Sequence, residues 1–278
     1  MRVEVQGIGL EVEDHGSGFP VVLLHGFPLS SEIWAPVRPA IEQVARLVTP
    51  DLRGFGRSDK PDGPYGMDVL AADVVALADH LGLERFVLGG HSMGGYVAFR
   101  VAARVRERLA GLVLVDTRAE ADTPDGRAAR QAAIRRIGDD GADAFLASFV
   151  PNLVGPTTRE RAPRFLRDLE AIGREAPAHV LAGCLEGMME RPDSRELLGT
   201  LDVPALVLVG AEDPITPQET AQALATALPR ATLAVIPGAG HTPSVERPVV
   251  VADAIVAFLS ALAGPAPAPI ATPRSHGR

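Results

Sequence analysis

Short apolar runs alternate with helical patterns along most of the chain. Six runs lack the polar alternation of a half-exposed strand, and they cover residues 20–24, 46–49, 85–88, 111–115, 205–209 and 232–236. Such runs are typical of strands that are covered on both faces of a sheet. Two amphipathic strands, residues 2–6 and 10–14, precede them. The pattern predicts an α/β fold with a mostly parallel, eight-stranded sheet and helices on both faces.

Helical periodicity fills most connections between these strands. Leu70, Val74, Leu77 and Leu81 recur at helical spacing, and further helices are predicted over residues 96–105, 218–228 and 248–262. Residues 117–199 break the alternation, because they carry helical patterns over 127–137, 142–149, 159–172 and 180–189 without a convincing strand. We expect a core of residues 1–116 and 200–262, a helical cap of residues 117–199, and a disordered Pro- and Ala-rich tail of residues 263–278.

Composition and charge narrow the function classes. The 278 residues carry a formal net charge of −8, which gives no general attraction to nucleic acid or anionic lipid. No apolar run reaches the length of about eighteen residues that a membrane helix needs, and residues 1–6 do not resemble a signal peptide. The single cysteine, Cys184, is expected to be a small buried apolar side chain. These features favour a cytoplasmic protein with a small-molecule partner and leave the oligomeric state open, a homo-oligomer included.

A glycine-rich motif follows the apolar run that ends at Leu88. Gly90-His91-Ser92-Met93-Gly94 fits the pattern G-x-S-x-G, a strand-to-helix turn that exposes a serine hydroxyl. Glycines suit this turn because it leaves no room for Cβ atoms beside the strained serine. The context predicts that Ser92 is a nucleophile. His91 is expected to point away and pack, with a proton relay as the alternative.

A nucleophilic serine needs a base and an acid that orients the base. His241 follows the last predicted strand, and Asp213 follows the strand before it, in Gly210-Ala211-Glu212-Asp213-Pro214. Loops at the carboxyl ends of parallel strands converge on one edge of the sheet, so Ser92, Asp213 and His241 can meet there. The sequence therefore predicts a Ser-Asp-His triad.

Two backbone N–H groups are candidates for an oxyanion hole. One belongs to Met93, directly after the nucleophile, and the other to Phe27, in the motif His25-Gly26-Phe27-Pro28 that follows the strand 20–24. Pro28 has no N–H to offer. For His25 we favour a structural role in this loop over a role as a second base.

These motifs, in this order, resemble the α/β-hydrolase fold family over residues 1–262. Further matching segments are Asp51-Leu52-Arg53-Gly54-Phe55-Gly56-Arg57-Ser58 and Gly238-Ala239-Gly240-His241. The resemblance implies that residues 117–199 are the family's cap, which roofs the pocket and selects the substrate. Haloalkane dehalogenases and epoxide hydrolases of the family carry Asp where this chain has Ser92. Hydroxynitrile lyases of the family need a lysine near the pocket. The only lysine of this chain, Lys60, lies in the loop after the Asp51 motif, which argues against that activity. Asp116 is the alternative acid, and Asp213 is preferred.

The resemblance and the residues together predict a serine hydrolase of small to medium carboxylic esters that works through an acyl-enzyme. A lactonase or enol-lactonase, a cofactor-free perhydrolase favoured by Pro28, and a small-molecule receptor are the alternatives. No cofactor or metal is expected, because the dinucleotide, P-loop and H-E-x-x-H motifs are absent from the sequence. In the cap, the candidate substrate-binding residues are the apolar side chains of Phe145, Leu185, Met188 and Met189, together with Pro28 at the oxyanion loop.

Overall fold

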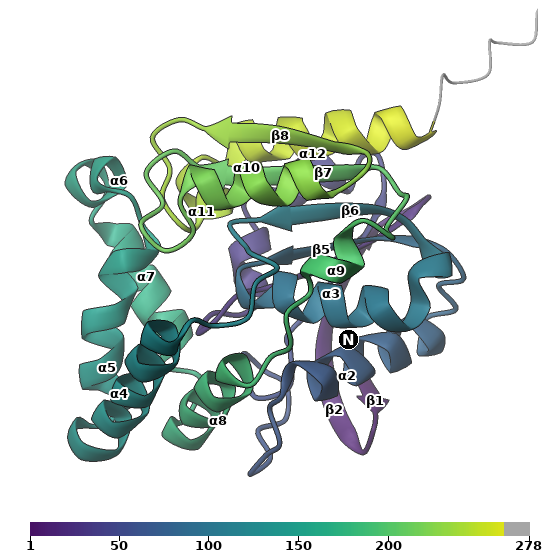
Figure 1. Cartoon of the computed structure of the whole chain (residues 1–278). Coiled ribbons are helices and arrows are strands. Elements are labelled where there is room, and N and C mark those ends of the chain that lie inside the picture. Colours follow the sequence, from purple (N-terminus) through teal and green to yellow (C-terminus); the bar gives the residue numbers. More distant parts are fainter. Residues whose placement is uncertain (264–278) are drawn as a thin grey trace, which may run out of the picture.

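An eight-stranded sheet forms the centre of the computed structural model, which describes residues 1–263 (Figure 1). The strands follow the order β1-β2-β4-β3-β5-β6-β7-β8. They are β1 (Arg2–Val5), β2 (Ile8–Gly16), β3 (Pro20–Leu24), β4 (Arg46–Pro50), β5 (Phe86–His91), β6 (Leu109–Val115), β7 (Ala205–Gly210) and β8 (Ala231–Ile236). β1 and β2 pair in antiparallel fashion and the other six strands are parallel. The mostly parallel, eight-stranded sheet predicted from the sequence is confirmed.

Helices cover both faces of this sheet, as predicted (Figure 1). One face carries α2 (Met67–His80), α3 (Met93–Val105) and α10 (Gln218–Ala227), and the other carries α1 (Arg38–Ile41) and α12 (Pro248–Ala263). β5 and β7 are buried along their whole length between these layers, which explains their uninterrupted apolar sequences. Within residues 1–263, no helix combines the length and apolar character required to cross a membrane.

Helices without strands fill residues 117–199. Most of them lie beyond one end of the parallel strands, at the left of Figure 1: α4 (Pro124–Asp140), α5 (Ala142–Phe149), α6 (Pro156–Arg161), α7 (Arg164–Gly173) and α8 (Ala178–Met189). The last, α9 (Arg195–Leu198), lies near the centre of this view and contacts α10. The single helix predicted over 159–172 is wrong, because Ala162 leaves the helical conformation (φ −142°) before Pro163. Proline disfavours the helical conformation of the residue before it.

Short helical turns complete the chain at η1 (Ser31–Trp34), η2 (Arg106–Arg108), η3 (Val150–Leu153) and α11 (Pro243–Glu246). α12 ends at Ala263, one residue inside the predicted tail, and residues 264–278 lie outside the described residues. Cys184 is buried in α8, and burial raises the pKa of its thiol, in keeping with the expected apolar role.

The strand register brings the carboxyl ends of the central strands together. His91 of β5 is paired with Val115 of β6, and Val115 is paired with Leu208 of β7. The residues that follow these strands, among them Ser92 and Asp116, therefore gather at one edge of the sheet. The cap helices lie at this same edge (Figure 1).

Candidate active site

Ser92 occupies a sharp turn between β5 and α3. Its backbone has a positive φ of 50°, which is unusual for a residue with a side chain. A Cβ atom on Gly90 would lie 2.2 Å from the carbonyl carbon of Gly94, and one on Gly94 would lie 2.5 Å from the backbone oxygen of Leu24. Both approaches involve backbone, which cannot move aside cheaply. The glycines of the motif are therefore required by the turn, as the sequence indicated.

The structure brings Ser92, His241 and Asp213 into one chain of hydrogen bonds. His241 Nε2 lies 2.9 Å from Ser92 Oγ, and His241 Nδ1 lies 2.8 Å from Asp213 Oδ2. Both His241 and Asp213 are buried. In this arrangement the Nδ1–H group donates to Asp213, which leaves Nε2 free to accept the serine proton.

Asp213 is held as an anion by its surroundings. Burial by itself would raise the pKa of this carboxyl group, but the charge of His241 and the hydrogen bonds from His241 and Thr216 hold the pKa well below its usual range. Ile215 N donates to Asp213 Oδ1 at 2.7 Å, and the Thr216 hydroxyl donates to Oδ2. Nothing in the sequence pattern singled out Thr216, although a Thr three residues after an Asp is a common turn arrangement.

Asp116 lies beside this triad without bonding the imidazole. Its Oδ1 accepts a hydrogen bond from Gly210 N at 2.9 Å, and its side chain is fully buried. Asp213 is therefore the carboxylate in contact with His241, as the sequence preferred. One donor atom from each of Asp116, Asp213 and His241 lies within 4.8 Å of the others, a grouping compatible with a metal ion. Both His241 nitrogens already take part in the triad, so a metal bound through Nδ1 would replace the bond to Asp213.

Two buried side chains hold the loop that carries His241. His91 Nε2–H donates to the backbone oxygen of His241 at 2.5 Å. Burial, together with the charge of His241, lowers the pKa of His91 to about 3, so its ring is neutral near pH 7. The expectation that His91 points away is wrong, because its ring faces the His241 backbone. Glu246 accepts hydrogen bonds from Gly240 N at 2.8 Å and Thr242 N at 3.2 Å.

Phe27 N–H, in the loop after β3, and Met93 N–H, at the start of α3, stay the predicted donors of an oxyanion hole. Leu29 N donates to Gly26 O at 2.9 Å, which closes the turn around Phe27 and Pro28. The first backbone bonds of α3 run from Gly95 N and Tyr96 N to Ser92 O, so Met93 N–H belongs to the unbonded first turn of the helix.

His25 has the structural role predicted for it. Its Nδ1–H donates to Gly26 O at 3.0 Å, and its Nε2 accepts from Leu52 N at 2.9 Å. Burial lowers the pKa of its imidazole. The ring thus links the loop after β3 to the loop after β4.

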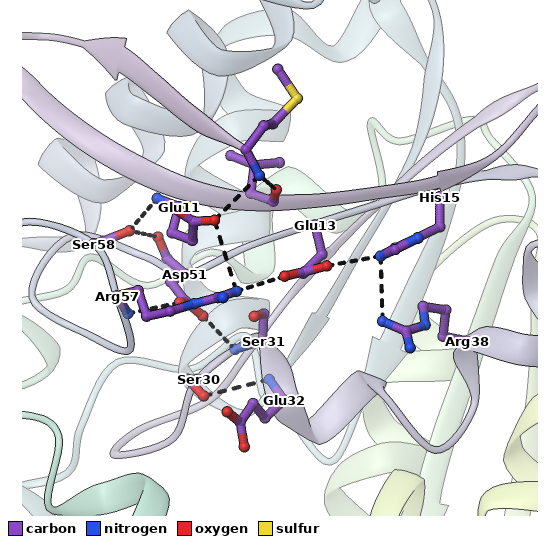
Figure 2. A network of polar contacts seen from close by, with 12 residues as sticks. Glu11, Glu13, His15, Ser30, Ser31, Glu32, Arg38, Asp51, Arg57 and Ser58 are labelled. Atoms are coloured by element: carbon purple, nitrogen blue, oxygen red, sulfur yellow. Dashed lines mark hydrogen bonds and ion pairs between the residues drawn. The ribbon is translucent and has the colours of Figure 1, made fainter.

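Asp51 joins the same two loops from the other side (Figure 2). Its Oδ1 accepts from Ser31 N at 2.8 Å, and its Oδ2 accepts from Arg57 N at 2.9 Å. Ser58 Oγ donates to the Asp51 backbone oxygen at 2.6 Å. Gly56 has a positive φ of 50°, and a Cβ there would lie 2.2 Å from Asp51 Oδ2. The segment 51–58 therefore supports the loop after β3 and does not contact Ser92, Asp213 or His241 through a hydrogen bond.

An aromatic cluster connects helix α5 to the loop after β3. The ring of Phe27 lies 6.1 Å from Phe145 and 5.7 Å from Phe149 of α5, and 6.2 Å from Phe55, measured between centroids. Phe145 is therefore placed beside the site. Phe149 joins it, at 5.3 Å in a stacked arrangement, and was missing from the predicted substrate-binding residues.

The other predicted cap residues pack elsewhere. Leu185 and Met188 are buried in α8, which packs on α4. Met188 Sδ accepts a hydrogen bond from Arg130 Nη1 at 3.4 Å, and Met189 O accepts from Arg127 Nη1 at 2.5 Å. These contacts belong to the packing of the cap, and a role in substrate binding for Leu185, Met188 and Met189 stays a prediction.

Comparisons with known proteins agree with this geometry. The model of the alpha/beta hydrolase fold matches residues 20–248. The chain is 31% identical over 209 residues to 3-oxoadipate enol-lactonase 2 of Acinetobacter baylyi, covering 75% of this chain and 76% of the relative. It is 33% identical over 245 residues to the dihydrolipoyllysine-residue acetyltransferase component of the acetoin cleaving system of Pseudomonas putida, of which it spans 64%.

Among solved structures, a thermophilic esterase from Thermogutta terrifontis has 40% sequence identity and a TM-score of 0.90. The match covers 94% of this chain and 99% of the esterase. The fold thus agrees with the sequence similarity over most of the chain. The chain belongs to the alpha/beta hydrolase fold family.

Proposed function

We propose that this protein is a serine hydrolase that cleaves small to medium carboxylic esters through an acyl-enzyme. The observation that carries the proposal is the position of His241, 2.9 Å from Ser92 Oγ and 2.8 Å from Asp213 Oδ2. The imidazole can take a proton from the serine while a buried carboxylate stabilises the cation that results. The similarity to a solved esterase gives independent support.

Acylation follows from this arrangement. Ser92 Oγ attacks the ester carbonyl carbon as its proton passes to His241 Nε2, and the carbonyl oxygen becomes an oxyanion. The N–H groups of Phe27 and Met93 donate to that oxyanion. The tetrahedral intermediate then collapses, the bond to the alcohol oxygen breaks, and His241 Nε2–H protonates the departing alcohol. The acyl group remains on Ser92 as a new ester.

Deacylation repeats the same steps with water. His241 Nε2 takes a proton from a water molecule, whose oxygen attacks the acyl carbon. The second tetrahedral intermediate releases the carboxylic acid, and the proton on Nε2 returns to Ser92 Oγ. Asp213 stays ionised throughout and stabilises the imidazolium in both halves of the reaction.

The substrate class follows from the side chains nearest the oxyanion loop. Phe27, Phe145 and Phe149 offer apolar ring surface within one cluster. Such a surface suits an uncharged acyl or aryl group. Lactone hydrolysis is the second candidate, since one relative is named an enol-lactonase and a lactone is an internal ester that the same triad can open.

A panel of p-nitrophenyl esters tests the proposed substrate class. We expect acyl chains of roughly two to eight carbons to be hydrolysed faster than long-chain lipids, because the apolar cluster lies between α5 of the cap and the loop after β3. Initial rates of p-nitrophenol release, measured on one preparation with lactones and with acetate plus hydrogen peroxide alongside, give the ranking. Faster turnover of lactones, or of peroxide to peracid, would make that activity the principal one. Turnover of none of these substrates would contradict the hydrolase proposal and favour the receptor alternative.

The pH dependence tests His241 as the base. A protonated imidazole cannot accept the serine proton, so kcat/KM should fall on the acid side. Asp213 does not titrate near neutral pH, because its pKa is held well below its usual value. His91 does not either, since its pKa is lowered to about 3. Full activity at pH 4 would be incompatible with a histidine base.

A further inference from the structure

We infer that Asp116 is a positioning residue, a neutral carboxylic acid that donates its proton in a hydrogen bond to the carboxylate of Asp213. The inference rests on the proposed function, because Asp213 matters as the orienting acid of the triad. Asp116 itself takes no direct part in the proposed acylation or deacylation.

The backbone conformation of Asp116 directs its side chain toward the end of β7. Asp116 follows β6 directly and has a positive φ of 44°, an uncommon conformation that Asp tolerates better than most residues. Its backbone N–H donates to Leu208 O of β7 at 2.9 Å, and its Oδ1 accepts from Gly210 N at 2.9 Å. These two bonds fix both the chain and the carboxyl group against β7.

The second oxygen of Asp116 has nothing to stabilise a negative charge. Asp116 is 0% exposed, and its Oδ2 is buried without a hydrogen-bond donor among residues 1–263. A carboxyl oxygen of Asp116 and one of Asp213 lie within 4.8 Å of each other. Two carboxylates this close, away from water, cannot both be ionised at moderate cost, so one of them keeps a proton.

Hydrogen-bond donors decide which carboxyl group keeps the charge. Asp213 receives donors from His241, Ile215 and Thr216, whereas Asp116 receives one, from Gly210. Donors stabilise the anion, so the charge stays on Asp213 and the proton on Asp116.

The charges around Asp116 act in the same direction. Burial, followed by the charge of Asp213, raises the pKa of Asp116 well above its usual value, and the charge of Glu246 of α11 adds to this. The other titratable groups facing this corner are His241, which is bonded to Asp213, and His91 at the end of β5, which is neutral near pH 7.

A proton on Asp116 has two consequences for the triad. It gives Asp213 a further donor, which holds the carboxylate in the orientation that His241 Nδ1–H requires. It also shares the negative charge of Asp213, so the imidazolium of His241 is stabilised less than it would be by an unshared carboxylate. Asp116 thereby helps to set the pH at which the base becomes protonated.

Two substitutions of Asp116 test whether its side chain donates a hydrogen bond to Asp213. Asp116→Asn keeps an acceptor for Gly210 N and presents an N–H donor to Asp213, so it mimics the neutral acid. We expect its kcat/KM to stay within about threefold of wild type, with the acid midpoint unchanged. Asp116→Leu removes both bonds and should lower kcat about tenfold or more and move the acid midpoint up by about half a pH unit.

The direction in which Asp116→Asn moves the acid midpoint of kcat/KM tests whether Asp116 carries a proton. If Asp116 were ionised in the wild type, Asn would remove a negative charge near His241 and the acid midpoint would move to lower pH. That result would overturn the inference. An Asp116→Leu variant with the kcat and acid midpoint of wild type would also overturn it, because a donor to Asp213 would then be unnecessary.

Infrared difference spectroscopy detects the proton on Asp116 without a catalytic assay. A protonated carboxyl group has a carbonyl band that carboxylates lack, so wild type minus Asp116→Asn at pH 8 should show this band. The exposed Asp193, whose pKa is lowered to about 2 by Arg195, is the matched control, and Asp193→Asn should leave the band in place. Absence of the band in an enzyme that hydrolyses esters through Ser92 would refute the proton on Asp116 alone. A band in a protein that hydrolyses no ester would refute the proposed function alone.

Discussion

Replacement of Ser92 with alanine should reduce kcat for p-nitrophenyl acetate about 10⁶-fold, the loss seen when a triad nucleophile is removed. The reason is that Ser92 Oγ is the atom that bonds to the acyl carbon, and water cannot occupy its position with the same geometry. Alanine keeps a Cβ at the strained position, so the turn and α3 should be preserved. The measurement is kcat at saturating substrate for wild type and Ser92→Ala.

The matched control for this loss is Ser260→Ala, since Ser260 is exposed on α12 and takes no part in the site. Its kcat should equal that of wild type. Circular dichroism should show that Ser92→Ala is folded. A folded Ser92→Ala protein that turns over the ester at a rate near wild type would show that another group is the nucleophile.

Substitution of Asp213 with Asn should lower kcat about 10⁴-fold. The Asn amide would present a donor or a weaker acceptor to His241 Nδ1, which favours the tautomer with the proton on Nε2. In that tautomer the imidazole cannot accept a proton from Ser92 Oγ. The kcat values of Asp213→Asn and Asp116→Asn, determined in parallel, provide the comparison.

Asp116→Asn should lose far less, because Asp116 bonds Gly210 N and leaves the imidazole to Asp213. The two variants are matched in chemistry and lie in the same buried corner. A larger loss in Asp116→Asn than in Asp213→Asn would assign the orienting acid to the end of β6.

The sheet was predictable because its strands have one physical signature. Strands buried on both faces, such as β5 and β7, need apolar side chains on both sides, so their sequences contain uninterrupted apolar runs. The short turns η1 and α11 carry no such signature, since they are too brief for a hydrophobic period to develop. The break between α6 and α7 was missed, although Pro163 marks the place.

The positions of Ser92, Asp213 and His241 could be proposed from sequence because each follows a recognisable strand at one edge of the sheet. The residues that hold them could not. The bond from His91 to the His241 backbone, and the bond from Gly155 N to Glu246, join segments that are distant in sequence and meet only through tertiary packing. No local sequence pattern identifies the hydrogen-bond partner of such a buried polar side chain.

The cap was the least predictable region. Phe145 was among the predicted substrate-binding residues, but its contact with Phe27, which Phe149 shares, depends on how α5 lies over the core. The stripe formed by Leu185, Met188 and Met189 has the same spacing, yet α8 packs on α4. Periodicity identifies the apolar face of a helix and leaves open whether that face meets a substrate or a neighbouring helix.

Mass spectrometry of the trapped intermediate tests the acyl-enzyme most directly. Wild-type protein mixed with p-nitrophenyl acetate, quenched in acid during turnover and digested, should yield an acetylated peptide that contains Ser92. The same peptide from Ser92→Ala should carry no acetyl group. An unmodified Ser92 peptide, found while p-nitrophenol is being released at the wild-type rate and the acetyl group appears on another residue, would contradict the proposed mechanism.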